Sequence, residues 1–163
     1  MEPPPLALLQ MITPVVMVVA TAYSALYVVL APRVVPLARC YAFAADAIFG
    51  LFYYPLVVAF ALRAIWDLHH NVHSRWHGPC DASRMLAVVL VSRMIVHIPF
   101  LNLKKQIRDD KSQWPIFLTH HVIVIVVYTS GLLLGRAHFW GALNALCETT
   151  NVFLTVIELF TCW

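Results

Sequence analysis

Long runs of apolar residues alternate with short polar segments along the whole chain. A lipid bilayer has a hydrocarbon core about 30 Å thick, which a helix of about 20 apolar residues can cross. Several of the runs are this long, and a charged stretch separates each run from the next. The pattern predicts an all-α protein, a multi-pass transmembrane bundle of about five spans, at residues 6–31, 41–65, 85–101, 115–134 and 139–163.

The composition excludes a water-soluble globular protein. Apolar residues make up 61% of the chain, charged residues make up 12%, and the mean hydropathy is +0.78, whereas soluble domains contain roughly 45–50% apolar residues. The net charge of +3 is small, and the Lys and Arg residues lie near the ends of the runs, so no nucleic-acid-binding patch is visible. We expect a single transmembrane domain over residues 1–163, with membrane lipids and not nucleic acids as partners.

The basic residues between the runs indicate an orientation in the membrane. The first and third loops hold six Lys and Arg residues, and the second and fourth loops hold four. Cytoplasmic loops of membrane proteins carry an excess of these residues. The difference favours an N-terminus outside the cytosol and a cytosolic basic loop at residues 104–111.

The run at residues 85–101 contains Arg93 and His97, which lie four residues apart and share one face of a helix. An Arg in the middle of a span costs about 2.5–3.5 kcal/mol on insertion scales, so Arg93 needs a partner inside the bundle. The candidate partners are acidic residues of other runs, Asp46, Glu148 and Glu158. We favour a buried ion pair that holds the bundle together, and the alternative is a guanidinium that grips a lipid headgroup.

The last run carries a polar stripe, because five polar residues recur at spacings of four, three, four and three and so share one helical face. They are Asn144, Glu148, Asn151, Thr155 and Glu158. A stripe of this kind cannot face lipid, so it lines the bundle interior or a polar cavity. We interpret Glu148 as part of a functional cavity, and Glu158 as a polar contact between helices.

Two adjacent histidines, His120 and His121, lie near the start of the run at residues 115–134, and Tyr128 follows on about the same face as His121. Neighbouring helical positions point about 100° apart, so we do not expect both imidazoles to face lipid. An imidazole exchanges protons near neutral pH or ligates a metal. We therefore interpret the pair as functional, with a structural role as the alternative.

A histidine-rich segment lies in the polar stretch between the second and third runs. It contains an HHxxH pattern that resembles one histidine box of the membrane di-iron desaturases and hydroxylases, and its members are His69, His70, His73 and His77. Three of them, His69, His73 and His77, would align on one face of a helix. The di-iron enzymes need several boxes on one membrane side, so we favour a headgroup-facing cluster over a metal site.

Four segments in order resemble the motifs of the TLC-domain family of multi-pass membrane proteins, which includes the ceramide synthases and the translocation-associated membrane proteins. They are Ser92 to His97, Asp110 to Pro115, Phe117 to Val122 with its paired histidines, and Glu148 to Leu154. The TLC-like region extends over residues 41–163 and is best matched over 87–160. Family members usually continue through further helices, so we expect a chain truncated at its C-terminus.

The resemblance implies an intramembrane lipid pocket and a role in lipid homeostasis, including sphingolipid metabolism, in the endoplasmic reticulum, another endomembrane or the plasma membrane. It assigns hypothetical catalytic roles to His120, His121 and Glu148. It assigns hypothetical lipid-binding roles to Asp46, Arg93, His97, Tyr128, Asn144 and Asn151. No cofactor is expected.

A ceramide-synthase-like N-acyltransferase, with acyl-CoA as co-substrate and a long-chain base as acceptor, is the enzymatic alternative. His120 or His121 would take a proton from the attacking amine, and Glu148 would orient the imidazole or stabilise its cation. Ceramide synthases have a His-Asp pair and a further Asp where this chain has Cys147, Glu148 and Asn151. A non-catalytic lipid-binding protein is therefore expected at least as strongly as an enzyme.

Overall fold

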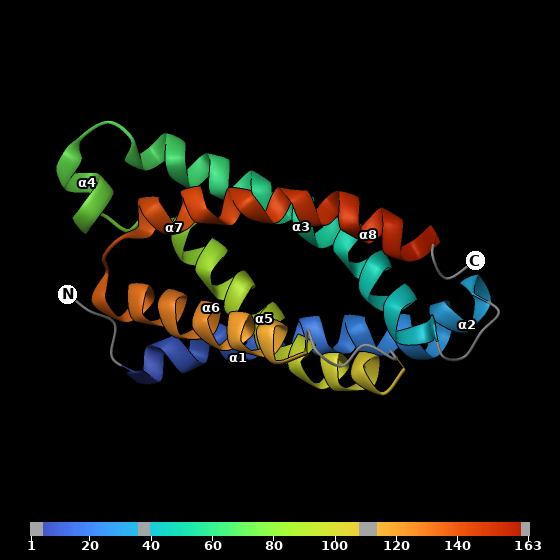
Figure 1. Cartoon of the computed structure of the whole chain (residues 1–163). Coiled ribbons are helices and arrows are strands. Elements are labelled where there is room, and N and C mark those ends of the chain that lie inside the picture. Colours follow the sequence, from blue (N-terminus) through green and yellow to red (C-terminus); the bar gives the residue numbers. More distant parts are fainter. Residues whose placement is uncertain (1–4, 36–39, 108–113, 161–163) are drawn as a thin grey trace.

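The structure of the chain is a computed structural model that describes residues 5–35, 40–107 and 114–160. The described residues form helices joined by short connections, with no strand among them (Figure 1). α1 (Pro5–Ala25) continues through the π-helical segment η1 (Leu26–Leu30) into α2 (Ala31–Val34). The later elements are α3 (Tyr41–Leu68), α4 (Val72–His77), α5 (Asp81–Ile107), α6 (Trp114–Leu134), α7 (His138–Ala145), the 3₁₀ segment η3 (Leu146–Thr149) and α8 (Thr150–Phe160).

The predicted all-α transmembrane bundle is confirmed. Four helical segments are long and apolar enough to cross a membrane, and each contains one of the first four predicted spans. These segments are Leu6–Val34, Tyr41–Leu68, Val72–Asn102 and Trp114–Leu134. The first two are longer than the predicted spans because their helices continue past the last apolar residues into the polar connections, and the third is longer mainly because it includes α4 and the start of α5.

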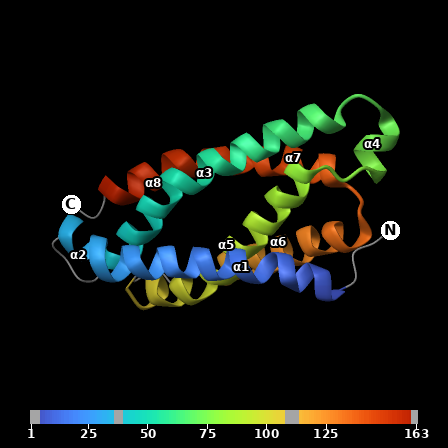
Figure 2. The same ribbon diagram turned by 180° about the vertical axis from the view of Figure 1, so that it is seen from behind.

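The predicted fifth span is a broken helix. α7 ends at Ala145, and the 3₁₀ segment η3 leads into α8. The two helices follow one line beside α3 (Figure 2). A 3₁₀ helix is wound more tightly than an α-helix, so the side chains of η3 point in directions that regular helical spacing does not predict.

α5 crosses the interior of the bundle. α3, α7 and α8 lie on one side of it, and α1 and α6 lie on the other (Figures 1 and 2). Every side chain from Leu86 to Met94 is buried. A helix enclosed by other helices faces little lipid, which explains why the run at residues 85–101 tolerates polar residues and has the weakest apolar pattern.

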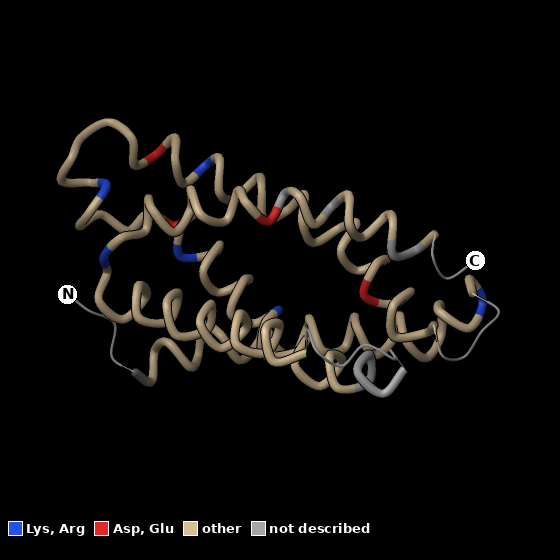
Figure 3. Tube along the Cα trace, viewed as in Figure 1, with Lys and Arg blue, Asp and Glu red and all other residues tan. Residues whose placement is uncertain are grey.

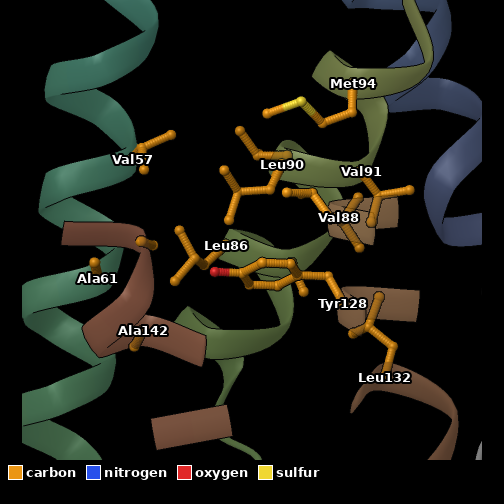
Figure 4. Packing of buried hydrophobic residues seen from close by; sticks show 14 of the residues in the cluster. Val57, Ala61, Leu86, Val88, Leu90, Val91, Met94, Tyr128, Leu132 and Ala142 are labelled. Atoms are coloured by element: carbon orange, nitrogen blue, oxygen red, sulfur yellow. The ribbon is translucent and has the colours of Figure 1, made fainter. Parts of the chain in front are cut away.

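The largest apolar core lies where α5 meets its neighbours. Figure 4 shows side chains of α3, α5, α6 and α7 meeting there. The labelled members are Val57, Ala61, Leu86, Val88, Leu90, Val91, Met94, Tyr128, Leu132 and Ala142. Because close packing and not water exclusion drives association between membrane helices, this core fixes how α5 sits between the two sides of the bundle.

Gly50 allows α8 to approach α3. A Cβ atom at this position would lie only 2.8 Å from Thr155 Cγ2 and 3.0 Å from Tyr54 Cε2. Real Cβ atoms do not approach other atoms this closely. Small residues commonly permit such contacts between membrane helices, so the position of α8 depends on the missing side chain.

We expect Gly50→Leu to lower the free energy of unfolding by about 1–3 kcal/mol, the usual cost of overpacking. The added atoms would push Thr155 and α8 away from α3. Unfolding in detergent micelles measures the change, and Ala59→Leu is the matched control because Ala59 lies on α3 with its side chain exposed. Equal stability of the two variants would contradict the close approach.

Candidate functional site

A buried ion pair joins α3 and α5. Arg93 Nη2 donates a hydrogen bond to Asp46 Oδ1, and the Tyr23 hydroxyl of α1 donates to the same oxygen. All three residues are buried. Asp46 is therefore the partner of Arg93 among the three candidates that the sequence offered.

Three aromatic rings surround the Arg93 guanidinium. Its Cζ atom lies 4.8 Å from the ring centre of Tyr23, 5.5 Å from that of Phe49 and 5.6 Å from that of Tyr53. The face of an aromatic ring attracts a cation, most strongly where water is excluded. Since protein groups enclose the guanidinium, the geometry favours the ion pair over the headgroup-gripping alternative.

His97 and His121 extend this polar network from α5 into α6. His97 Nε2 lies 3.1 Å from Asp46 Oδ2, and His97 Nδ1 lies 2.8 Å from His121 Nε2. His121 Nδ1 lies 2.8 Å from the backbone oxygen of Phe117. Both ring nitrogens of both histidines thus have neighbours within the protein, and neither imidazole offers a nitrogen to a substrate.

His120 points away from this network and faces η3. Its Nε2 lies 3.9 Å from Glu148 Oε1, and its side chain is 49% exposed. The Glu148 side chain is only 17% exposed, and Asn151 Nδ2 donates to its Oε2. An imidazole beside a carboxylate can take up a proton and be stabilised as a cation. Of the polar groups described above, His120 is the one that an approaching molecule can reach.

The polar stripe of the last run is only partly realised. The hydrogen bond between Asn151 and Glu148 shows that these two side chains share a face. Thr155 is buried, and its hydroxyl donates to the Asn151 backbone oxygen. Asn144 is exposed on α7, before the 3₁₀ segment changes the helical register. The side chain of Glu158 lies outside the described residues, as do the side chains of the basic loop at residues 104–111.

The ring of Tyr128 lies in the apolar core, and its hydroxyl faces α7. The ring packs among core residues of α5 (Figure 4), and the hydroxyl donates a 2.8 Å hydrogen bond to the backbone oxygen of Gly141. His121 and Tyr128 do share a face of α6, as their spacing predicted, and both are buried. The face is polar at His121 and apolar two turns later, because a different part of α5 packs against it.

The histidine-rich segment is divided between two helices. His69 and His70 follow the end of α3, and the Asn71 side chain caps the start of α4. The predicted alignment of His69 with His73 and His77 is therefore wrong, because Asn71 begins a new helix. Only His73 and His77 remain one turn apart, with ring centres separated by 5.0 Å.

The histidines of this segment lie at one end of the bundle, where charged residues gather (Figure 3). The Arg75 guanidinium lies 5.5 Å from the Phe139 ring and links α4 to α7. His138, the first residue of α7, is buried there, and burial lowers the pKa of its imidazole. No three His, Cys, Asp or Glu side chains within residues 5–35, 40–107 and 114–160 are placed to hold a metal ion, so the geometry lends no support to a di-iron centre.

Tyr23 belongs to the polar network but was not singled out from the sequence. It lies in a long aliphatic run, where its hydroxyl group is the one feature that could have pointed to it, because a buried hydroxyl needs an acceptor. The Phe117 backbone oxygen, which receives the His121 ring, has no signal in the sequence. Both groups are identified by packing alone.

Residues 44–161 match a family model described as the TLC domain. The chain belongs to the TLC-domain family. The matched range covers most of the chain and agrees closely with the TLC-like region expected at residues 41–163. No curated protein and no solved structure gave a significant match.

As a TLC-domain protein, the chain is an integral multi-pass membrane protein of a family generally connected with lipids. The matched residues include Asp46, Arg93, both members of the histidine pair and Glu148. Tyr23 precedes the matched range, so α1 adds one member to the polar network from outside the TLC domain. Both the buried network and the exposed His120 side chain therefore belong to the TLC domain itself.

Proposed function

We propose that this TLC-domain protein binds a membrane lipid at the His120–Glu148 pair and acts in lipid homeostasis as a lipid-binding or lipid-modifying protein. The observation that carries the proposal is that the two side chains differ in their exposure to solvent. His120 is half exposed, whereas Glu148 is shielded and held by Asn151. A shielded carboxylate inside a membrane protein is costly and is a functional candidate by default.

The surroundings of His120 suit an amphiphilic ligand. The neighbouring side chains of Ile116 and Phe117, four and three residues before His120 on α6, are exposed and apolar, so a hydrocarbon chain can lie against them. The imidazole and the carboxylate then supply partners for the polar group of the lipid. This combination of an apolar surface with a few polar groups is typical of small-molecule sites.

Acyl transfer is the reaction that these groups would support if the protein is an enzyme. The amine of a long-chain base would attack the thioester carbon of an acyl-CoA, and His120 would take the proton that the amine loses. The thiolate of CoA would leave as the C–S bond breaks, and it would receive the proton from the imidazolium. Glu148 would stabilise the imidazolium in the interval.

His120 suits the role of base better than His121. Its side chain is reachable, and its carboxylate neighbour is shielded from solvent. The nitrogens of His121 lie against His97 and the Phe117 backbone oxygen. We further propose sphingolipids as the lipid class and the endoplasmic reticulum as the compartment, both from the family resemblance.

Photolabelling tests the lipid site directly. The protein is reconstituted in lipid nanodiscs with a photoactivatable sphingosine, irradiated and digested, and the labelled peptides are identified by mass spectrometry. We expect label on the first turns of α6 and on η3, and we expect excess unlabelled sphingosine to reduce it. Unlabelled sphingosine displaces the probe from a saturable site. It does not displace probe molecules that lie unspecifically against the outer surface of the bundle.

Two variants sharpen the photolabelling test. His120→Trp should block the site and remove the competed label, because the indole is larger than the imidazole. His70→Trp is the matched control, because His70 is exposed in the segment before α4, outside the proposed site. Label that is spread over α1 and α3 and unaffected by the competitor would overturn the proposed site.

A further inference from the structure

His73 and His77 form an exposed pair of imidazoles on α4. They are four residues apart, so they lie on one face of the helix, one turn from each other. Both side chains are exposed. Neither imidazole makes a hydrogen bond or an ion pair within residues 5–35, 40–107 and 114–160. The ring nitrogens of both residues are therefore available to a ligand from outside the protein.

The distance between the two rings fits a shared metal ion. Zinc binds a histidine nitrogen at about 2.0–2.1 Å, so two imidazoles on one ion, at an angle between a right angle and the tetrahedral angle, have ring centres about 4.5–5.2 Å apart. The ring centres of His73 and His77 are 5.0 Å apart. Two histidines one helical turn apart also supply zinc ligands in the HExxH metalloproteases. The pair therefore has the spacing of a chelating site without any change in the backbone.

The other two histidines of this segment do not have that spacing. The ring centres of His69 and His70 are 3.9 Å apart, which is shorter than the separation that a shared ion requires. His69 Nδ1 also lies 2.6 Å from the backbone oxygen of Trp66. Both residues precede the Asn71 cap and lie outside α4. The chelating spacing is therefore a property of the α4 pair.

The charged side chain of α4 is held on the opposite face of the helix. Arg75 is two residues from each of the paired histidines, which places it on the other side of α4. Its Nη2 atom donates a 2.7 Å hydrogen bond to the backbone oxygen of His69, and its guanidinium lies 5.5 Å from the Phe139 ring of α7. These contacts hold the positive charge of Arg75 between α4 and α7, so its repulsion of a cation at the exposed face is reduced.

We propose that His73 and His77 bind a divalent transition-metal ion, such as zinc, with water in the remaining coordination positions. Imidazole nitrogens suit zinc, copper and nickel, whereas magnesium and calcium prefer oxygen ligands. Structural zinc sites usually have four protein ligands, so a site with two protein ligands holds its ion reversibly. The site lies apart from the proposed lipid site, because α4 lies at the end of the bundle where α6 ends and α7 begins, whereas His120 lies near the start of α6 (Figure 1).

A bound ion stabilises α4 by linking its first turn to its last residue. The helix has only six residues, and the Asn71 side chain caps its start. A ligand that binds the folded form and not the unfolded form shifts the equilibrium towards the folded form. The Ala137 backbone nitrogen donates a 3.0 Å hydrogen bond to the Trp76 backbone oxygen. Metal binding therefore steadies the contact between α4 and the turn that joins α6 to α7.

Zinc titration tests the site. The protein is purified without a histidine tag, freed of metal with a chelator, reconstituted in nanodiscs and titrated with zinc in a calorimeter. We expect one zinc ion per chain. Changing an outer partner of a metal ligand already costs about 10–100-fold in affinity, so His73→Ala and His77→Ala should each weaken binding at least that much. His70→Ala is the matched control, because it removes an exposed imidazole outside α4, and it should bind zinc as the unaltered protein does.

Two further measurements report on the ligands and on the helix. Electron paramagnetic resonance with one equivalent of Cu²⁺ counts the nitrogen ligands, and we expect two. Zinc should slow hydrogen exchange of the α4 backbone in the unaltered protein and not in His73→Ala. Absence of zinc binding by the unaltered protein, or equal affinities of His73→Ala and His70→Ala, would overturn the site. If a variant fails to fold, the copper spectrum of the unaltered protein decides, because any count of nitrogens other than two would contradict the shared ion.

Discussion

Arg93→Met should lower the free energy of unfolding by about 3–5 kcal/mol, the usual cost of removing one partner of a buried ion pair. Asp46 would be left as a buried carboxylate without its guanidinium, and Tyr23, Phe49 and Tyr53 would lose the cation that their rings surround. Methionine fills a similar volume, so little of the loss would come from a cavity. Denaturation in mixed detergent micelles measures the change.

The double variant Arg93→Met with Asp46→Asn separates the effect of the unpaired charge on the free energy of unfolding from the effect of altered packing. Replacing both partners removes the uncompensated charge, so most of the stability should return. Residues in contact are expected to be strongly non-additive in such a cycle. An Arg93→Met protein within about 1 kcal/mol of the unaltered one, or a double variant less stable than either single variant, would contradict the account of the buried pair.

The helical architecture was largely readable from the apolar pattern. The first four spans follow from runs of about 20 apolar residues, and the structure contains a helix at each. The run at residues 85–101 had the weakest apolar pattern, but it forms the most buried of the four spans. Hydropathy measures how well a segment suits a lipid environment, whereas α5 contacts mainly protein. The break at η3 could not be predicted, because it depends on how α7 and α8 pack against α3.

The sequence predicted most residues of the polar site, but it predicted only in part which of them contact one another. The cost of burying Arg93 required an acidic partner, and the sequence offered three. Tertiary packing selected Asp46. In the same way the sequence marked both His120 and His121, but only their surroundings distinguish the reachable imidazole from the enclosed one.

Enzymatic assay of His120 variants tests the central claim in its enzymatic form, that the His120–Glu148 pair both binds a lipid and modifies it. Purified protein is supplied with sphingosine and an acyl-CoA, and the N-acyl product is measured by mass spectrometry. Removing a general base typically costs 10²–10⁴-fold, so His120→Ala should lower the rate by about that factor. Glu148→Gln keeps the shape of the side chain and removes its charge, and we expect a smaller loss of rate.

His70→Ala is the matched control in this assay, because it removes an exposed imidazole from the segment before α4, at the end of the bundle. The account predicts product from the unaltered protein and from His70→Ala, with a loss confined to the His120 and Glu148 variants. Lack of product from the unaltered protein, with photolabel retained at α6, would reduce the function to lipid binding. Equal rates for His120→Ala and His70→Ala would contradict the central claim.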